Sequence, residues 1–260
     1  MNFIGEAKRL SDVDLPRLGA LIGVGEDEIH AVLEVECRGR GFDSQGRPAM
    51  LFEPHIFYRQ LKATGLEAEL QQAVDQGLAY PKWRRNYPKD SYPRLEQAMS
   101  LHREMALRSA SWGLGQIMGF NCSLCGYDSA EAMVADFLKG EAQQLRAMVA
   151  FITSAGLDDE LRRHDWHGFA RGYNGPGYAK HGYHTRLAKA YAKWARIPDT
   201  KWKRAEALTT TQAAGGGALN SDPQADDPPQ LVPVPDDLLT RLHSILAEIN
   251  NLTLKGKHHA

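Results

Sequence analysis

The chain has 260 residues, a formal net charge of −1 and a hydrophobic content of 43%, as in ordinary globular proteins. This length suffices for one large domain, or for one domain with an appendage. Residues 1–12 lack the apolar run of a signal peptide, and no segment reaches ~18 consecutive apolar residues. We therefore expect a protein that is made in the cytoplasm without a signal peptide and without a membrane span.

The first strong helical pattern lies in Glu26–Phe42, and Gly39 or Gly41 can end it. One helix face holds residues at i, i+3, i+4 and i+7, which are Ile29, Val32, Leu33 and Glu36. A carboxyl group on that inward face is desolvated and lies near the negative end of the helix dipole, and both effects raise its pKa. Glu36 is therefore a candidate general acid. The alternative is a helix-terminal acid whose side chain reaches outward to solvent.

A turn and a short apolar run follow this helix. Asp43–Pro48 has turn-forming residues and Ala49–Phe52 is apolar, which together predict a small β-hairpin. Glu53 comes directly after the apolar run. A second carboxylate near a general acid can position water or stabilise a developing positive charge. The alternative is that Glu53 pairs with a basic neighbour and only orients the loop.

Helices are expected over residues 54–63, 66–74 and 93–107, with a loop from Tyr80 to Tyr92 between the last two. This loop is rich in proline, aromatic residues and cations, including Lys82, Trp83, Arg84 and Arg85. Aromatic rings stack well on sugars and cations suit anionic polymers. A solvated loop anchored by its aromatic residues is the alternative.

The segment Ser111–Gly119 reads S-W-G-L-G-Q-I-M-G. Its glycines let the backbone approach another helix or a glycan. Gln116 is the polar residue among apolar neighbours and can hold an acetamido or hydroxyl group. An internally hydrogen-bonded glutamine is the alternative.

The three cysteines, Cys37, Cys122 and Cys125, do not form a disulfide framework. Cys122 and Cys125 form a C-S-L-C motif, but no second pair stands at zinc spacing. We interpret them as small buried side chains and expect no metal site.

The next part of the chain predicts several helices. Asp128 or Ser129 can cap one, Gly140 can divide it, and Asp165 can cap a short helix. The glycines of 172–177 then leave Tyr173 and Asn174 on a tight turn, before a final core helix over residues 183–195. Cations dominate residues 162–196, and their face suits an anionic polymer, although a solvated face is the default. No DNA-binding motif accompanies these cations, which argues against nucleic acid as a partner.

The composition changes after Arg204. Residues 205–235 are rich in Thr, Gly, Pro and Asp and are predicted to be a flexible linker. Residues 236–254 carry an apolar stripe at helical spacing and are predicted to be an amphipathic helix. An isolated helix of this length is marginal in water, so we expect it to dock on the first domain, on a second copy or on another protein.

Four motifs occur in order along the chain. They are V-E-C-R-G-R-G-F at residues 35–42, L-F-E-P-H-I-F at 51–57, S-W-G-L-G-Q-I-M-G at 111–119 and A-R-G-Y-N-G-P-G-Y at 170–178. Together they resemble the lysozyme-like muramidases and lytic transglycosylases, and most closely the N-acetylmuramidase domain of phage and prophage endolysins. The resemblance spans about residues 24–194. Cys37 stands where that pattern commonly has Ser, and Gly115 where a bulkier residue is usual.

The resemblance implies a mainly α (α+β) fold, a lysozyme-like helical domain over residues 1–204 with a small β-hairpin beside the active-site cleft. It implies hydrolysis of the β-1,4 bond between N-acetylmuramic acid and N-acetylglucosamine in the glycan strands of bacterial peptidoglycan. The enzyme would act on the cell wall, in the periplasm, after release from the cytoplasm. The implied catalytic residues are Glu36 and Glu53, and the implied substrate-binding residues are Ser111, Gln116, Tyr173 and Asn174.

No cofactor and no metal are implied by the resemblance. Two alternatives stay open. One is a lytic transglycosylase, in which the muramic 6-hydroxyl replaces water and gives 1,6-anhydro products. The other is a cell-wall-binding module without catalysis, against which the acid on the apolar helix face argues.

Overall fold

The computed structural model describes residues 2–37 and 40–202. In the first half of this part of the chain the helices are α1 (Asp14–Gly19), η1 (Ala20–Ile22), α2 (Glu26–Glu36), α3 (Pro54–Ala63), α4 (Glu67–Asp75) and α5 (Tyr92–Arg108). In the second half they are η2 (Gly119–Cys125), α6 (Ala130–Phe137), α7 (Glu141–Ser154), α8 (Asp158–Arg162), α9 (Trp166–Asn174) and α10 (Tyr183–Trp194). The fold is mostly helical, as the sequence predicts.

A small antiparallel sheet lies between the helices. Its strands, β1 (Met50–Phe52), β2 (Ala110–Trp112) and β3 (Ile117–Met118), are arranged in chain order. Leu51 is opposite Ser111 on β2, and Ser111 is opposite Met118 on β3. The sheet therefore joins the motif after the first candidate acid to the Gly-rich motif about sixty residues later, which places both beside each other.

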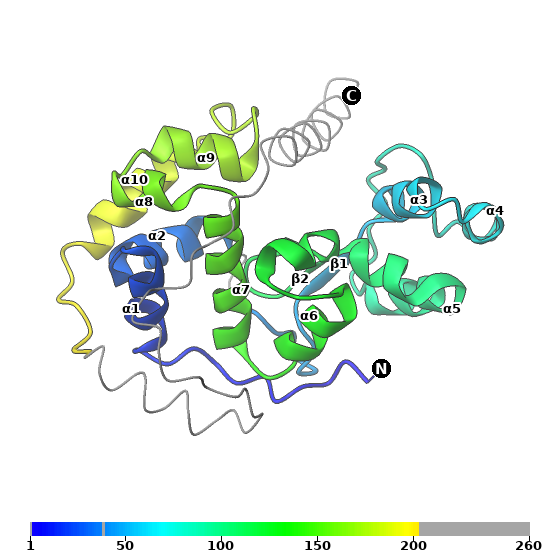
Figure 1. Cartoon of the computed structure of the whole chain (residues 1–260), viewed down its shortest axis with the longest axis horizontal. Coiled ribbons are helices and arrows are strands. Elements are labelled where there is room, and N and C mark those ends of the chain that lie inside the picture. The colour runs from blue at the N-terminus through cyan, green and yellow to red at the C-terminus, as the bar shows by residue number, and fades with distance from the viewer. Residues whose placement is uncertain (1, 38–39, 203–260) are drawn as a thin grey trace, which may run out of the picture.

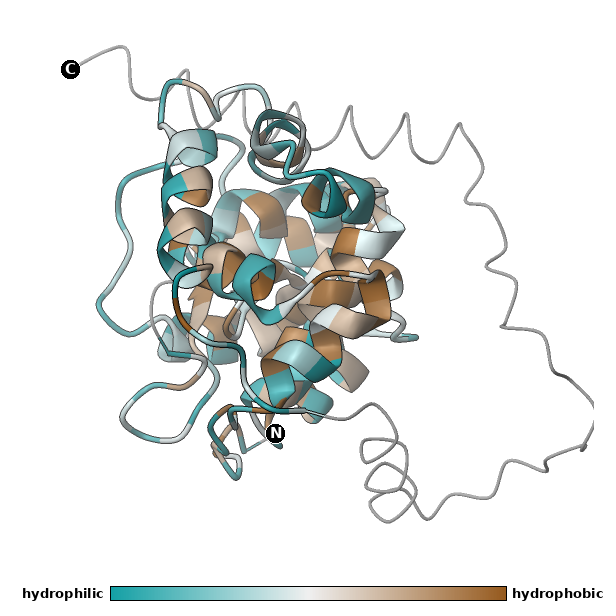
Figure 2. Cartoon of the chain, turned by 90° about the vertical axis from the view of Figure 1, so that its left-hand side faces the viewer, coloured by the Kyte–Doolittle hydropathy of each residue, from teal (hydrophilic) through white to brown (hydrophobic). Residues whose placement is uncertain are grey.

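The helices form two lobes around the sheet and α7 (Figure 1). The first lobe contains α1, α2, α8, α9 and α10, and the second contains α3, α4 and α5. The side of α7 that carries Leu145, Met148 and Ile152 is completely buried. Figure 2 shows hydrophobic residues concentrated towards the middle of the described chain, with hydrophilic residues towards its outer faces. Burial of this apolar surface is the main source of stability for the fold.

Several local predictions are confirmed. Ser129 Oγ accepts a hydrogen bond from Ala132 N at 3.0 Å, and Asp165 Oδ1 accepts one from Gly168 N at 2.9 Å, so both residues cap helices. Gly140 separates α6 from α7.

Three local predictions need correction. The turn at Asp43–Pro48 is closed by a bridge between Phe42 and Pro48 and by a hydrogen bond from Ala49 N to Gly41 O at 2.8 Å, but the strand β1 after Ala49 does not continue this pairing. It pairs with β2 instead, because partners distant in sequence complete the sheet. Helix α2 ends at Glu36, before either glycine, since Cys37 is extended. Tyr173 and Asn174 form the last turn of α9, which stops where Gly175 takes a positive φ of 76°.

None of the helices within the described ranges is long and apolar enough to cross a membrane. The predicted linker (205–235) and C-terminal helix (236–254) lie outside the described residues.

Candidate active site

Glu36 is the last residue of α2, and buried apolar side chains fix the position of that helix. Ile29 and Val32 are completely buried on its inner face. Along its outer side, His30 stacks on Trp194 of α10 with ring centroids 3.8 Å apart, and Trp194 Nε1 donates to Glu34 Oε2 at 2.9 Å. Because α9 in turn packs against α10, residues 138 positions apart meet at the end of α2.

The Glu36 carboxyl group has one protein partner in the described part of the chain. Asn174 Nδ2 donates a hydrogen bond to Glu36 Oε2 at 2.8 Å. The other oxygen, Oε1, is buried and makes no hydrogen bond with a described residue, and the same holds for Asn174 Oδ1. Buried polar atoms are normally satisfied, so this pair leaves an unused donor-acceptor position suited to a ligand.

Burial raises the pKa of Glu36 to about 7, against the opposing effects of the Asn174 hydrogen bond and the positive charge of Arg186 on α10. A carboxyl group with such a pKa is partly protonated at neutral pH. It can therefore donate a proton from Oε1 while Asn174 holds Oε2.

Two buried polar side chains on α7 hold the segment that follows Glu36. Gln144 is completely buried; its Oε1 accepts from Leu114 N at 2.7 Å and its Nε2 donates to Gly41 O at 3.3 Å. Glu141 Oε1 accepts from Gly41 N at 2.8 Å. The motif containing Glu36 and the Gly-rich motif are therefore tied to the same helix. The sequence reasoning missed Glu141 and Gln144, whose only signal is a pair of polar residues on an otherwise apolar helix face.

Glu53 lies at the start of α3, in the second lobe. Tyr87 donates a short hydrogen bond from its hydroxyl to Glu53 Oε2. His55 Nδ1 lies 3.3 Å from the same oxygen and forms an ion pair with it when the ring is protonated. This contact does not meet the geometry of a hydrogen bond. Both burial and the Glu53 carboxylate raise the pKa of Tyr87, which keeps its proton on the hydroxyl. Tyr87 was not singled out from the sequence, although it belongs to the aromatic loop noted there.

The Gly-rich motif uses most of its polar groups internally. Ser111 Oγ donates to Gln116 Oε1 at 3.1 Å, and Gln116 Nε2 donates to Gly113 O at 2.9 Å and to Ala49 O at 3.3 Å. Gln116 also takes a left-handed backbone conformation, with φ 49°. These contacts brace the β2–β3 turn against the strand before Glu53. Contact of Ser111 and Gln116 with glycan stays a prediction.

The glycines of this motif approach helices. A Cβ atom on Gly113 would lie 2.8 Å from Gln144, and one on Gly115 would lie 2.8 Å from Met148 Sδ. Met148 thus occupies the space that a bulkier residue at position 115 would need. Gly115 replaces the bulkier residue that is usual in the family pattern, and the Met148 side chain on α7 fills the space that this residue would occupy.

Tyr173 and Cys37 lie close enough to Glu36 for its charge to act on both side chains. The Tyr173 ring stacks on Phe169 with centroids 5.4 Å apart and meets the edge of Phe151 at 5.8 Å. Burial raises the pKa of Tyr173, and the nearby carboxylate of Glu36 adds to the effect. Burial also raises the pKa of Cys37 to about 12, so its thiol is neutral. Tyr173 is thus neutral and partly buried near the acid.

All three cysteines are free thiols. Over residues 2–37 and 40–202, no three His, Cys, Asp or Glu side chains gather in a way that could hold a metal ion.

The fold and the site together define a lysozyme-like enzyme: a mostly helical protein in which a helix-terminal glutamate of raised pKa meets an asparagine from a distant helix. Comparisons with known proteins agree. The family model for N-acetylmuramidase matches residues 26–195. A solved structure, described as the crystal structure of the Burkholderia AP3 phage endolysin, is 36% identical with a TM-score of 0.67, and the match covers 73% of each chain. A comparison with curated proteins found no match.

Since the family model covers well over half of the sequence, this chain belongs to the N-acetylmuramidase family of peptidoglycan hydrolases. Its helical fold with a small antiparallel sheet is that of the phage endolysin.

Proposed function

We propose that this protein hydrolyses the β-1,4 bond between N-acetylmuramic acid and N-acetylglucosamine, with Glu36 as the general acid. The observation that carries the proposal is the Glu36–Asn174 pair. One carboxyl oxygen is held at 2.8 Å by Asn174, while Oε1 is buried without a partner among the described residues. The pKa of about 7 keeps a proton available for the bridging oxygen as an oxocarbenium-like transition state forms.

In this mechanism Glu53 positions water or stabilises the developing charge. It enters from the opposite lobe, and Tyr87 holds its carboxylate in one orientation. Tyr173 and Asn174 would contact the sugar beside Glu36, with Asn174 Oδ1 as a free acceptor for a hydroxyl or amide group.

The first prediction concerns the acid. Glu36→Gln keeps the side-chain shape and can still accept the Asn174 hydrogen bond, but it cannot supply a proton. We expect a folded protein whose rate of peptidoglycan clearing falls roughly 10²- to 10⁴-fold. The measurement is turbidity loss of purified peptidoglycan, with circular dichroism to verify folding. A folded variant that clears at near-parent rate would show that Glu36 is not the acid.

The second prediction concerns the nucleophile. If water is captured, digested peptidoglycan carries reducing ends, and mass spectrometry shows products heavier by one water per cleavage than 1,6-anhydro products. Glu53→Gln removes the proposed water-positioning carboxylate, so we expect lower activity and a larger share of anhydro ends. Products dominated by anhydro ends in the parent enzyme would instead establish a lytic transglycosylase, whose tethered 6-hydroxyl avoids the entropic cost of capturing water. Near-parent activity of Glu53→Gln would remove Glu53 from the mechanism.

We further propose that the enzyme acts on the cell wall after release from the cytoplasm. Turbidity loss of intact Gram-negative cells, compared with cells stripped of their outer membrane, tests this. Only the stripped cells should clear if the enzyme needs another factor to reach the wall.

A further inference from the structure

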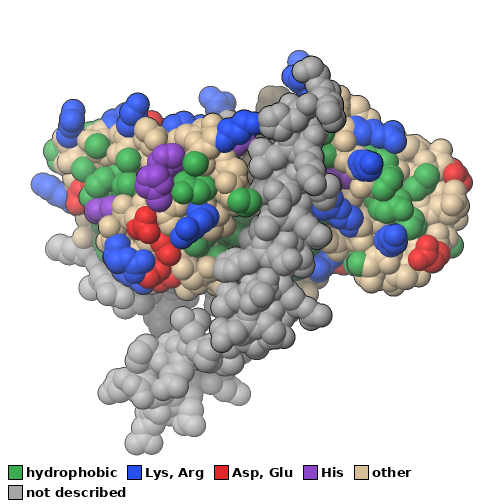
Figure 3. Space-filling model, turned by 90° about the horizontal axis from the view of Figure 1, so that it is seen from above, with side chains coloured by type: hydrophobic (Ala, Val, Ile, Leu, Met, Phe, Trp, Pro, Cys, Tyr) green, Lys and Arg blue, Asp and Glu red, His purple; other side chains and the backbone are tan. Residues whose placement is uncertain are grey.

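The loop between α4 and α5 carries a concentration of positive charge that the proposed chemistry does not use. We call residues 80–90 the cationic loop. Its four cations, all exposed, are Lys82, Arg84, Arg85 and Lys89. None of them forms an ion pair with another described residue, whereas Arg47, Arg103, Arg146 and Arg162 each do. Figure 3 shows Lys and Arg side chains prominent on the lobe formed by α3, α4 and α5.

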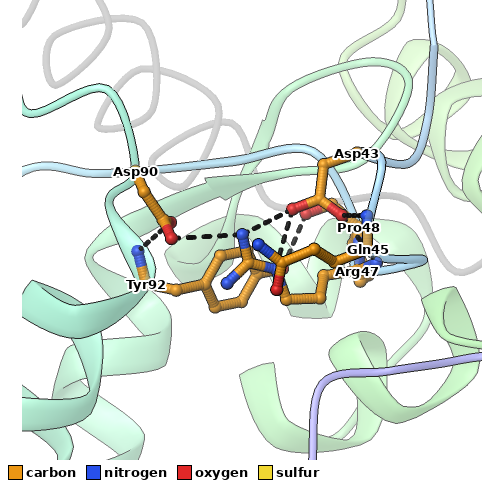
Figure 4. Close-up of polar contacts among 6 residues, drawn as sticks. All are labelled: Asp43, Gln45, Arg47, Pro48, Asp90 and Tyr92. Carbon is orange, nitrogen blue, oxygen red and sulfur yellow. Dashed lines mark hydrogen bonds and ion pairs between the residues drawn. The ribbon is translucent and has the colours of Figure 1, made fainter.

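The only acid of the loop is neutralised from outside. Asp90 Oδ2 lies 3.2 Å from Arg47 Nη2, and Arg47 also contacts Asp43 at 2.7 Å (Figure 4). The Arg47 guanidinium lies 4.1 Å from the centre of the Tyr92 ring. These contacts clamp the end of the loop to the turn at Asp43–Pro48, where Tyr92 also donates from its hydroxyl to Pro48 O at 2.6 Å. The loop therefore keeps its excess positive charge and a fixed end.

The body of the loop is also ordered by internal contacts. Tyr80 donates from its hydroxyl to Asn86 Oδ1 at 2.6 Å, and the Arg84 guanidinium lies 4.4 Å from the centre of the Tyr80 ring. Tyr87 holds the Glu53 carboxylate, and the Trp83 ring lies 6.2 Å from the Tyr87 ring. The cations are thus presented on a pre-ordered loop beside Glu53, which lowers the entropic cost of binding an anion there.

We propose that the cationic loop binds the carboxylates of the peptide stems that project from the glycan strand of peptidoglycan. The proposal rests on the proposed function, because it requires a glycan strand next to Glu53. Each muramic acid unit bears an acidic peptide, so negative charge lies beside the strand at every second sugar. Separate exposed cations suit such dispersed carboxylates. A lipid surface fits less well, because membrane-binding segments combine cations with exposed large apolar side chains, and none of those in the described chain lies in this loop.

Three of the cations allow a clean test. Lys82, Arg85 and Lys89 have no hydrogen bond, ion pair or ring contact within residues 2–37 and 40–202. The variant K82Q/R85Q/K89Q should therefore fold normally. Its matched control, K8Q/K62Q/K201Q, removes three other exposed cations and changes the net charge equally.

On intact peptidoglycan at low salt, the loop variant should show KM raised roughly tenfold with kcat within about twofold, because each of the three exposed contacts contributes only weakly. The control should match the parent. The difference should disappear at about 0.5 M salt, which screens exposed charges. It should also disappear on glycan strands whose peptides have been removed by an amidase.

Binding separates this proposal from the catalytic one. In the Glu36→Gln background, co-sedimentation with insoluble peptidoglycan needs no cleavage, and the loop variant should bind less well than the control. If the parent enzyme did not cut peptidoglycan but the loop variant still bound it less well than the control, the loop proposal would stand while the proposed function failed. Equal binding by loop variant and control, or an equal defect on peptide-free glycan, would overturn the loop proposal. A defect confined to phosphatidylglycerol vesicles would overturn it in favour of a membrane surface.

Discussion

At the scale of single residues, the surroundings of Glu36 favour its protonated form. It lies at the end of a helix, where the dipole disfavours a negative charge, and its surroundings are largely apolar. Asn174 offers one compensating hydrogen bond, which lowers the pKa less than burial raises it. The balance leaves an acid that changes its protonation near neutral pH, where a proton donor works best.

The third prediction follows from that pKa. Glu36 titrates near pH 7 in the folded protein but near its ordinary value of 4.5 when unfolded, so between these values the folded state binds more protons. Stability should therefore fall as pH rises from about 4.5 to 7, by about 2–3 kcal/mol in total from this group. Activity should fall over the upper part of the same window. Urea unfolding of parent and Glu36→Gln at pH 4.5 and 7.5 measures this. Equal pH dependence in the two proteins would show that Glu36 titrates normally.

At the scale of elements, α7 holds two segments of the site in place. Gln144 links α7 to the segment after Glu36 and to the Gly-rich motif, through Gly41 and Leu114. The close approach of Gly41 and Gly113 to the Gln144 side chain leaves no room for a Cβ at either glycine. One polar side chain thus sets the spacing between two motifs.

The fourth prediction tests this element. Gln144→Leu leaves the Gly41 carbonyl and the Leu114 amide buried without that partner, so the free energy of unfolding should fall by about 2–5 kcal/mol. Gln143→Leu, one position earlier and only half-buried, is the control and should change it by less than about 0.5 kcal/mol. Urea denaturation measures both. Similar values for the two variants would show that the Gln144 hydrogen bonds contribute little.

At the scale of the whole molecule, the buried apolar residues of the described part of the chain form one hydrophobic core. Helix α10 closes the first lobe against α2, and Thr200 N still donates to Glu26 Oε1 at 2.6 Å. The hydrogen bond at Thr200 therefore ties this segment to the first lobe. The domain boundary near residue 204 stays a prediction, because residues 203–260 lie outside the described part of the chain.

The fifth prediction concerns that boundary. A chain ending at Arg204 should keep the main thermal transition within a few degrees and should still cut purified peptidoglycan, because linker compositions add no core. Differential scanning calorimetry and the turbidity assay measure the two properties. Loss of the main transition would show that the apolar stripe in 236–254 belongs to the core.

The sequence by itself determined the helical class and the family, and it also predicted Glu36 as the candidate acid. The 3.6-residue pattern that buries Ile29 and Val32 also places Glu36 at the inner edge of α2, so local periodicity was enough. Caps such as Ser129 and Asp165 were readable for the same reason, since each acts within three residues of itself.

Only the tertiary structure decided which residues meet. Asn174 reaches Glu36 from 138 positions away, Tyr87 reaches Glu53 from 34, and β1 pairs with β2 instead of folding back on its own turn. The sequence predicts that Gln116 contacts a glycan. In the structure its side-chain amide accepts a hydrogen bond from Ser111 and donates to the carbonyl groups of Gly113 and Ala49. A hydrogen-bonding group in a sequence shows only its capacity to donate or accept. Its partner is fixed by the packing of the whole core, because most buried polar atoms are satisfied by the groups that the folded chain brings within reach.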